Sequence, residues 1–142
     1  MIEHQYGKVE LPAKLIKALS LILAHYSIPK DAQRIALNCR DQRYHLQREG
    51  LHPIEVQFER QSSTHWRMVF IASFSYLDKD QQTMDVELYF HLKHGWCYQP
   101  DINCELTITE PSVLALFNSW TQAIYQHLIS GAFDDIGITL IR

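Results

Sequence analysis

The stretch LNCRDQRYHLQREGLHPIEVQFER, residues 37–60, decides the fold of this chain. Apolar and polar residues alternate at both of its ends, which is typical of strands that bury one face. The segment between them, residues 41–52, is polar and contains Gly50, a residue type that adopts backbone angles other residues avoid. The stretch therefore predicts a strand, a polar loop and a second strand.

The alternation divides the side chains of these two strands between two faces of a sheet. The apolar set, expected to point into the core, is Ile35, Leu37, Cys39, Ile54, Val56 and Phe58. The polar set, expected on the outer face, is Asn38, Arg40, Glu55, Gln57 and Glu59. The loop beside this outer face adds Asp41, Tyr44 and His52.

The rest of the chain supplies helices and further strands. Apolar residues recur at helical spacing in residues 11–26 and 113–128, with Thr109 as the expected N-cap of the second helix. Strand-like alternation occurs in residues 65–77, 84–92, 96–98, 102–108 and 136–141. The first of these segments is expected to place one set of side chains on a single face: Trp66, Met68, Phe70, Ala72, Phe74 and Tyr76. Hairpin-length connections predict an α+β fold, with an antiparallel sheet of about five to six strands and two main helices packed on one face.

Length and composition are those of a globular protein. The chain has 142 residues, of which 46% are hydrophobic and 20% are charged, so residues 1–142 are expected to form a single domain with a substantial core. Residues 1–9 are polar and are expected to form a loose N-terminal arm or a short edge strand.

Charge and cysteine content restrict the expected partners and location. A net charge of −3 makes nucleic acid an unlikely partner. The N-terminal residues do not show the basic region followed by an apolar run that is typical of a signal peptide. The most apolar segment, residues 11–26, is too short and too charged to span a membrane. Three cysteines, an odd number, argue against a disulfide framework and favour a reducing compartment. We therefore expect a cytoplasmic protein with no membrane association.

Combined motifs in the opening stretch resemble the signature of an uncharacterised bacterial domain-of-unknown-function family. These motifs are LNxRDxxY at residues 37–44, GxHPxE at residues 50–55, and Glu59-Arg60. The resemblance continues through residues 71–76 and 117–120 to the end of the chain, so it covers nearly all of it. It implies a bacterial origin and a similar single-domain fold of about this length. It implies no activity, ligand or catalytic residue.

The candidate binding residues are Asn38, Arg40, Asp41, Tyr44, His52 and Glu55. In a functional interpretation, Arg40 binds an anionic group, Asn38 orients the ligand, and His52 or Glu55 transfers a proton. In a structural interpretation, Arg40 pairs with Glu55 or Glu59 across the strands, Asp41 and Asn38 cap the loop backbone, and His52 fixes the turn before Pro53. The sequence leaves both interpretations open.

Other reactive side chains are expected to be structural. His91, His94 and Cys97 have metal-ligand spacing, but on a strand the two histidines point to opposite faces and no second ligand pair follows, so no metal site is predicted. Cys39 lies on the inner face and is expected to be a core residue and not a nucleophile. The carboxylates Glu55, Glu59, Asp85 and Glu87 are expected to be solvated on the outer face. No glycine-rich phosphate loop or nucleotide-binding motif occurs, so no cofactor is expected.

Two functional hypotheses follow. The first is a non-catalytic binding module that contacts an unknown protein or small-molecule partner, with a homodimer as one possibility, through the outer sheet face and the 41–52 loop. The alternative is a small enzyme that acts on an anionic metabolite, with Arg40 as the anchor and His52 or Glu55 as the acid or base. The absence of a recognisable catalytic motif favours the first.

Overall fold

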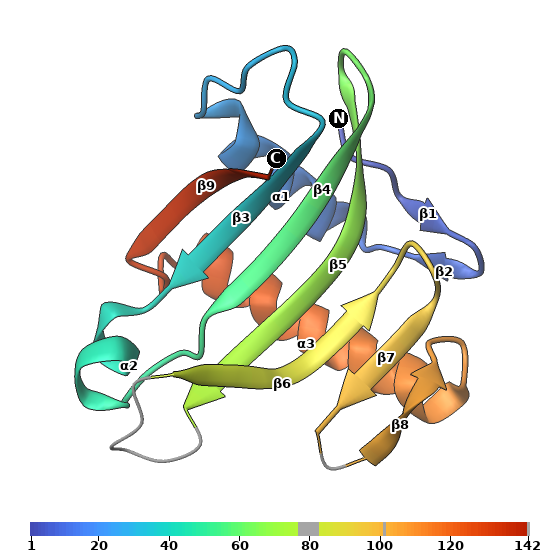
Figure 1. Cartoon of the computed structure of the whole chain (residues 1–142), viewed down its shortest axis with the longest axis vertical. Coiled ribbons are helices and arrows are strands. Elements are labelled where there is room, and N and C mark those ends of the chain that lie inside the picture. The colour runs from blue at the N-terminus through green and yellow to red at the C-terminus, as the bar shows by residue number, and fades with distance from the viewer. Residues whose placement is uncertain (77–82, 101, 142) are drawn as a thin grey trace.

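A seven-stranded antiparallel sheet is the centre of the structure, a computed structural model that describes residues 1–76, 83–100 and 102–141 (Figure 1). Its strand order is β8-β7-β6-β5-β4-β3-β9. The strands are β3 (Arg34–Arg40), β4 (Ile54–Ser62), β5 (His65–Tyr76), β6 (Met84–His91), β7 (Trp96–Gln99), β8 (Ile102–Thr107) and β9 (Asp135–Ile141). The helices are α1 (Ala13–Ala24), α2 (Gln42–Gln47) and α3 (Pro111–Ile129).

The sheet follows the chain from β3 to β8, and each strand pairs with the next. Helix α3 then crosses back along the sheet, and β9 pairs with β3 at the opposite edge (Figure 1). The predicted α+β class with an antiparallel sheet is confirmed. Seven strands are present where five to six were expected, because the short β7 and the C-terminal β9 both join this sheet.

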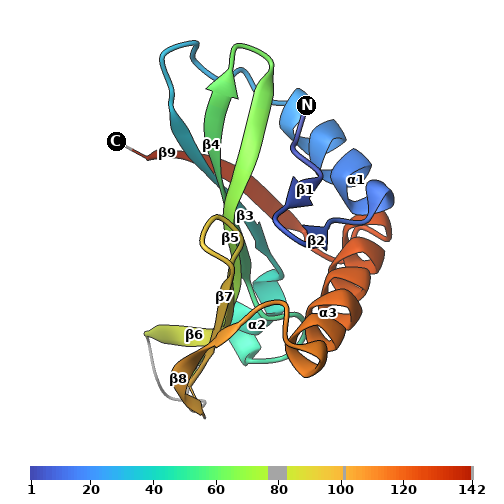
Figure 2. The same ribbon diagram turned by 90° about the vertical axis from the view of Figure 1, so that its right-hand side faces the viewer.

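Helices α1 and α3 lie on one face of the sheet, as predicted, and leave the opposite face uncovered (Figure 2). Each helix buries an apolar stripe against the sheet, and the central strands contribute fully buried side chains such as Phe58, Ile71 and Phe90. The aromatic rings of Phe90 and Phe117 meet edge to face, with their centroids 4.9 Å apart, at the centre of this layer. We call the uncovered side of the sheet the open face. No helix among the described residues is long and apolar enough to cross a membrane.

β-bulges interrupt the alternation of side chains along the sheet, and two of them bear on the candidate surfaces. In the pairing of β4 with β5, Phe58 lies opposite Met68 and Gln57 lies opposite Phe70, so one extra residue, Val69, stands between them. Trp66 and Met68 are therefore buried on the helix side, whereas Phe70 and Ala72 belong to the open face. The expectation that these four residues share one face is wrong, because alternation alone does not reveal a bulge.

The second bulge lies in β6. Leu88 pairs with Ser73 and Val86 pairs with Phe74, so Glu87 is the extra residue. A bulged residue leaves the regular ladder and its side chain is redirected. This redirection matters for the candidate site below.

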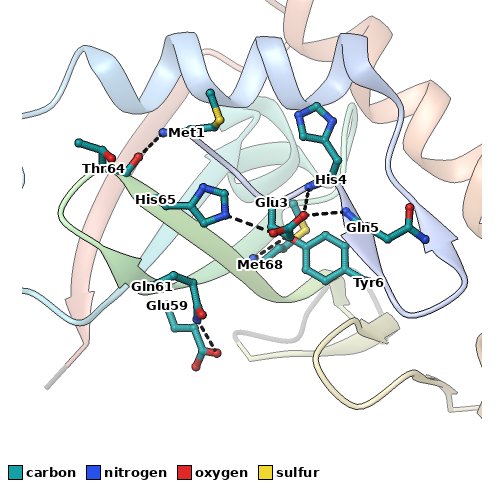
Figure 3. A network of polar contacts seen from close by, with 10 residues as sticks. All are labelled: Met1, Glu3, His4, Gln5, Tyr6, Glu59, Gln61, Thr64, His65 and Met68. Atoms are coloured by element: carbon teal, nitrogen blue, oxygen red, sulfur yellow. Dashed lines mark hydrogen bonds and ion pairs between the residues drawn. The ribbon is translucent and has the colours of Figure 1, made fainter.

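The N-terminal residues are not a loose arm. They form a hairpin of β1 (Gln5–Tyr6) and β2 (Val9–Glu10), which is a two-stranded sheet of its own and not an edge strand of the main sheet. Ile2 forms a parallel bridge with Trp66, and the amino group of Met1 donates to the carbonyl oxygen of Thr64 at 2.7 Å (Figure 3). The hydroxyl oxygen of Tyr6 accepts a hydrogen bond from the backbone N–H of Met68 at 2.8 Å (Figure 3). Burial of Ile2, Tyr6 and Val9 explains why this segment is held against the domain.

Helix α3, the second of the two predicted helices, does not begin with the N-cap residue that the sequence predicts. Its N-cap is Glu110, whose side chain makes no capping hydrogen bond, and not Thr109. Pro111 occupies the first helical position, where its fixed φ angle suits the helix and its missing N–H costs little. The prediction of Thr109 as the N-cap is therefore wrong.

The contact between α3 and the sheet predicts a clear difference between two neighbouring residues. Phe117 is fully buried, whereas 37% of the Leu116 surface is exposed. Phe117→Ala should lower the free energy of unfolding by about 3–5 kcal/mol because it leaves a cavity at the centre of the core. Leu116→Ala should change it by no more than about 0.5–1 kcal/mol. Urea unfolding followed by circular dichroism measures both; equal effects would contradict this packing.

Candidate functional site

The six candidate residues do not form one cluster. Asn38, Arg40 and Glu55 lie on the open face, where Asn38 is directly opposite Glu55 in the pairing of β3 with β4. The side-chain amide of Asn38 donates to the Thr139 hydroxyl at 3.3 Å, and Glu55 accepts a hydrogen bond from the Gln57 amide at 3.4 Å. Three of the six candidates therefore share a surface.

Arg40 is exposed at the end of β3 and makes no hydrogen bond or ion pair within the described part of the chain. The predicted pairing of Arg40 with Glu55 or Glu59 is therefore not what the structure shows. Glu59 instead binds Lys93 at 3.0 Å and Arg34 at 3.5 Å. Although burial alone would raise the pKa of Glu59, these two cations outweigh it and the net pKa is lowered.

Asn38, Arg40 and Glu55 border a cavity of about 340 Å³ on the open face. The remainder of its lining is mostly apolar: Pro53, Ile54, Phe74, Met84 and Thr83. A second hollow of about 120 Å³ lies on the β9 side and shares Asn38 and Arg40 with the first. Arg40 thus stands between two depressions in the surface. We call the larger one the Arg40 cavity.

Asp41 holds the 41–52 segment together. The segment was expected to be a loop, but it contains the short helix α2, and Asp41 is its N-cap. The buried carboxylate accepts hydrogen bonds from the backbone N–H groups of Arg43 at 3.1 Å and Leu51 at 3.0 Å, and it binds the Arg43 guanidinium at 3.1 Å. The Arg43 side chain, followed by the Leu51 N–H, lowers the pKa of Asp41 to about 2. This is the capping role that the structural interpretation proposed for Asp41.

Gly50 makes this arrangement possible. Its φ angle is +102°, and a Cβ atom at this position would lie 2.3 Å from Oδ2 of Asp41. Only glycine allows the backbone to approach the carboxylate so closely. The glycine and the aspartate are therefore two parts of one structural unit.

Tyr44 attaches α2 to the sheet. Its hydroxyl oxygen accepts a hydrogen bond from the backbone N–H of Tyr76 at 2.9 Å, and the side chain is buried. Its ring lies 4.3 Å from the ring of His52 and 5.4 Å from that of Tyr76, centroid to centroid. Tyr44 is thus a packing residue, and α2 lies at the end of the sheet on the side of α3 (Figure 2).

His52 faces the helix side of the sheet, away from Arg40. Its Nδ1 lies 2.5 Å from Oε2 of Glu87, the bulged residue of β6, and Oε1 of Glu87 accepts a hydrogen bond from the Ser73 hydroxyl at 3.3 Å. These groups border a cavity of about 120 Å³ between the sheet and α3, which is also lined by Trp120, His127 and Phe133. The structure therefore does not bring His52 together with Arg40 or Glu55.

The pair of His52 and Glu87 has a definite chemical character. A carboxylate that binds Nδ1 of an imidazole fixes its tautomer and leaves Nε2 available as a proton acceptor. The sequence did not indicate Ser73 as a site residue and placed Glu87 among solvated carboxylates. The bulge that aims Glu87 at His52 has no signal in the alternation, so no pattern could have found this pair.

A row of stacked rings crosses the open face from β5 to the turn after β6; we call it the aromatic ladder. Its members are Phe70, Tyr89, Trp96, His91 and His94. Centroids are 4.8 Å apart for Phe70 and Tyr89, 5.2 Å for Tyr89 and Trp96, 4.8 Å for Trp96 and His91, and 4.7 Å for His91 and His94. Neighbouring rings are tilted by no more than 25°. The faces of neighbouring rings therefore contact one another.

Two members of the ladder, His91 and Tyr89, have shifted pKa values. Burial, and then the charges of His94 and Lys93, lower the pKa of His91, and burial raises the pKa of Tyr89. The expectation that His91 and His94 lie on opposite faces is wrong, because the chain turns after β6 and stacks the two rings. No group of three or more His, Cys, Asp or Glu side chains suited to a metal ion occurs among the residues that the structure describes.

The two described cysteine side chains, Cys39 and Cys97, are buried and carry free thiols. Burial raises the pKa of Cys39 to about 12 and that of Cys97 to about 11. A thiol with such a pKa has little thiolate near neutral pH and is a poor nucleophile. Cys39 is therefore a core residue, as the inner-face pattern predicted.

The low pKa of Asp41 predicts a pH-dependent effect on stability. Asp41→Asn should destabilise the protein at pH 7, because Asn carries no charge for Arg43 and has one acceptor oxygen in place of two. The folded state holds this carboxyl ionised below its ordinary pKa of 3.8, so its contribution is complete above about pH 4 and is lost as the pH falls towards 2. Urea unfolding at pH 7 and near pH 3 should show the difference between variant and parent shrinking. A difference that grows in acid would contradict this role.

Gly50 and Gly131 provide a matched test of the close approach. Both have positive φ angles, but a Cβ on Gly131 would meet nothing within 4 Å. Gly131→Ala should therefore cost only the backbone strain of about 1–2 kcal/mol. Gly50→Ala should cost more, because the methyl group also displaces Asp41. Thermal unfolding of the two variants compares them, and equal losses would show that the contact with Asp41 is unimportant.

Comparison with known proteins agrees with the fold and leaves the function open. A hypothetical protein, VC0508, from the VSP-II pathogenicity island of Vibrio cholerae superimposes with a TM-score of 0.77 and 22% identity over 92% of this chain and 93% of the other. The conserved hypothetical protein VC1805 from pathogenicity island VPI-2 of Vibrio cholerae O1 biovar eltor also has a TM-score of 0.77, with 21% identity over 98% of this chain and 100% of the other. The VC1805 structure is described as sharing structural homology with the human P32 protein. No curated protein matches the chain. The sequence model of the DUF2787 family of proteins of unknown function matches residues 13–139, and the chain therefore belongs to that family, in keeping with the resemblance seen in its sequence.

Proposed function

We propose that this protein is a non-catalytic binding module whose contact surface is the open face of the sheet, bounded at one end by the 41–52 segment. The observation that supports this most directly is the aromatic ladder on a sheet face that no helix covers (Figure 2). The proposed occupant is a protein partner, either another protein or a second copy of this chain.

The composition of the open face fits a protein contact. Tyr89 and Trp96 are partly buried by their neighbours, and 38% of the Tyr98 surface is exposed beside them. Tyrosine and tryptophan are enriched in protein interfaces, where they supply large contact areas at low entropic cost. Charges of both signs flank the ladder, with Glu59 held between Lys93 and Arg34. Such a mixed border favours a specific protein partner over a uniformly charged one.

Nucleic acid fits this surface less well. Proteins that bind single strands on a sheet stack the bases on exposed faces of aromatic rings. In the aromatic ladder the ring faces are occupied by one another, and the net charge of the chain is −3. Neither feature supports binding to a polyanion.

The enzyme hypothesis receives less support from the geometry. It requires Arg40 to anchor a metabolite beside His52 or Glu55. Arg40 and Glu55 do share the open face, but His52 points to the cavity beneath α3 and binds Glu87 there. The proposed anchor and the imidazole therefore cannot act on one small substrate.

Site-specific photocrosslinking in the bacterial host tests the proposed surface. A photoreactive residue at position 98 on the open face should give a discrete adduct with a partner or with a second copy of the chain. The matched control is position 21 on the outer side of α1, which is 58% exposed and should give none. Trp96→Ser should abolish the adduct from position 98, since it removes a central ring of the ladder.

Two outcomes would overturn the proposal. One is an equal adduct from position 21, which would place the contact on the helix side. The other is no adduct from position 98 while the protein remains folded and abundant. An adduct of twice the mass of the chain would identify self-association as the form of the contact.

A further inference from the structure

We propose that the Arg40 cavity binds a free α-amino acid with an apolar side chain. This site borders the aromatic ladder, because Glu55 lies opposite Ala72 and Ala72 lies opposite Tyr89, but it does not depend on the protein contact proposed above. The proposal rests on the arrangement of three side chains, Arg40, Asn38 and Glu55, around an apolar floor.

The cavity is bordered by two side chains of opposite charge, Arg40 and Glu55, that do not form an ion pair with each other. Arg40 has no ion pair or hydrogen bond with any residue that the structure describes, and Glu55 accepts only the weak hydrogen bond from Gln57 at 3.4 Å there. Elsewhere on the open face Glu59 is satisfied by two cations. A ligand that carries both a carboxylate and an ammonium group would form an ion pair with Arg40 through the first and with Glu55 through the second.

The register of the strands sets these charges at a suitable spacing. Glu55 lies directly opposite Asn38, and Arg40 is two residues further along β3 on the same face. Diagonal neighbours of this kind lie about 7–8 Å apart, with their Cβ atoms somewhat closer, within reach of long side chains. The carboxylate and ammonium groups on one carbon atom fit between them, with the Asn38 amide beside both.

The remaining lining determines the side chain of the ligand. Ile54, Phe74 and Met84 form apolar walls, and methionine adapts to ligands of different shape. The volume of about 340 Å³ is at the lower end of the range for small-molecule sites, about 300–1,000 Å³. These features fit leucine, methionine or phenylalanine. A second carboxylate on the ligand would meet apolar walls and the charge of Glu55, so glutamate should bind poorly.

Isothermal titration calorimetry on the purified chain tests the proposal. Leucine, methionine or phenylalanine should bind. The amide derivative, which lacks the carboxylate, and the N-acetyl derivative, which lacks the ammonium group, should each bind at least about tenfold more weakly. Glutamate should also bind at least about tenfold more weakly.

Variants locate the site. Arg40→Gln and Glu55→Gln should each weaken binding at least about tenfold, whereas Arg34→Gln, on the same face of β3 but outside the cavity, should leave it unchanged. Circular dichroism confirms that each variant is folded.

Three results would overturn the inference. These are no binding of any of the three amino acids up to about 10 mM by the folded protein, equal binding of the amide, or unchanged affinity in Arg40→Gln. Failure here would leave the photocrosslinking result at position 98 unaffected, so the two proposals are tested separately.

Discussion

The structure depends on the burial of one side of a wide sheet beneath two helices. Helices α1 and α3 supply the apolar stripes, and the meeting of Phe117 with Phe90 lies at the centre of that layer. Both main helices are used on this side, so the other side has no cover from within the described chain. Apolar side chains on the open face can therefore be shielded from water only by their neighbours on that face. The stacked rings of the aromatic ladder shield one another in this way. The packing of both helices on one side of the sheet thus produces both the core and the uncovered candidate surface.

Much of this fold could be predicted from the sequence because it rests on local patterns. The alternation in residues 34–40 and 54–59 placed Leu37 and Val56 in the core and Asn38 and Glu55 outside, and the structure agrees. Helical spacing identified α1 and α3, and the antiparallel sheet class led to the expectation that both pack on one face. These features depend on the side-chain period of each element, which any stretch of sequence carries within itself.

The candidate site was only partly predictable because it depends on geometry that no local pattern carries. A single inserted residue at Val69 moved Phe70 to the open face, and another at Glu87 turned a supposedly solvated carboxylate towards His52. The six candidate residues are close in sequence but divide between the open face, the interior of the 41–52 segment and the cavity beneath α3. Their polarity suggested one site, although Asp41 and Tyr44 are occupied in building the segment itself.

The pairing of β3 with β9 has a consequence for synthesis of the protein on the ribosome. β3 ends at residue 40, whereas its neighbour on one side begins at residue 135. While the intervening chain is being translated, one edge of β3 has backbone N–H and C=O groups without their final partners, and exposed strand edges of this kind favour intermolecular pairing. The C-terminal strand closes that edge last. This strand also contains Thr139, whose hydroxyl accepts the hydrogen bond from Asn38, so the surface around Arg40 takes its final form only after residue 139 has been made.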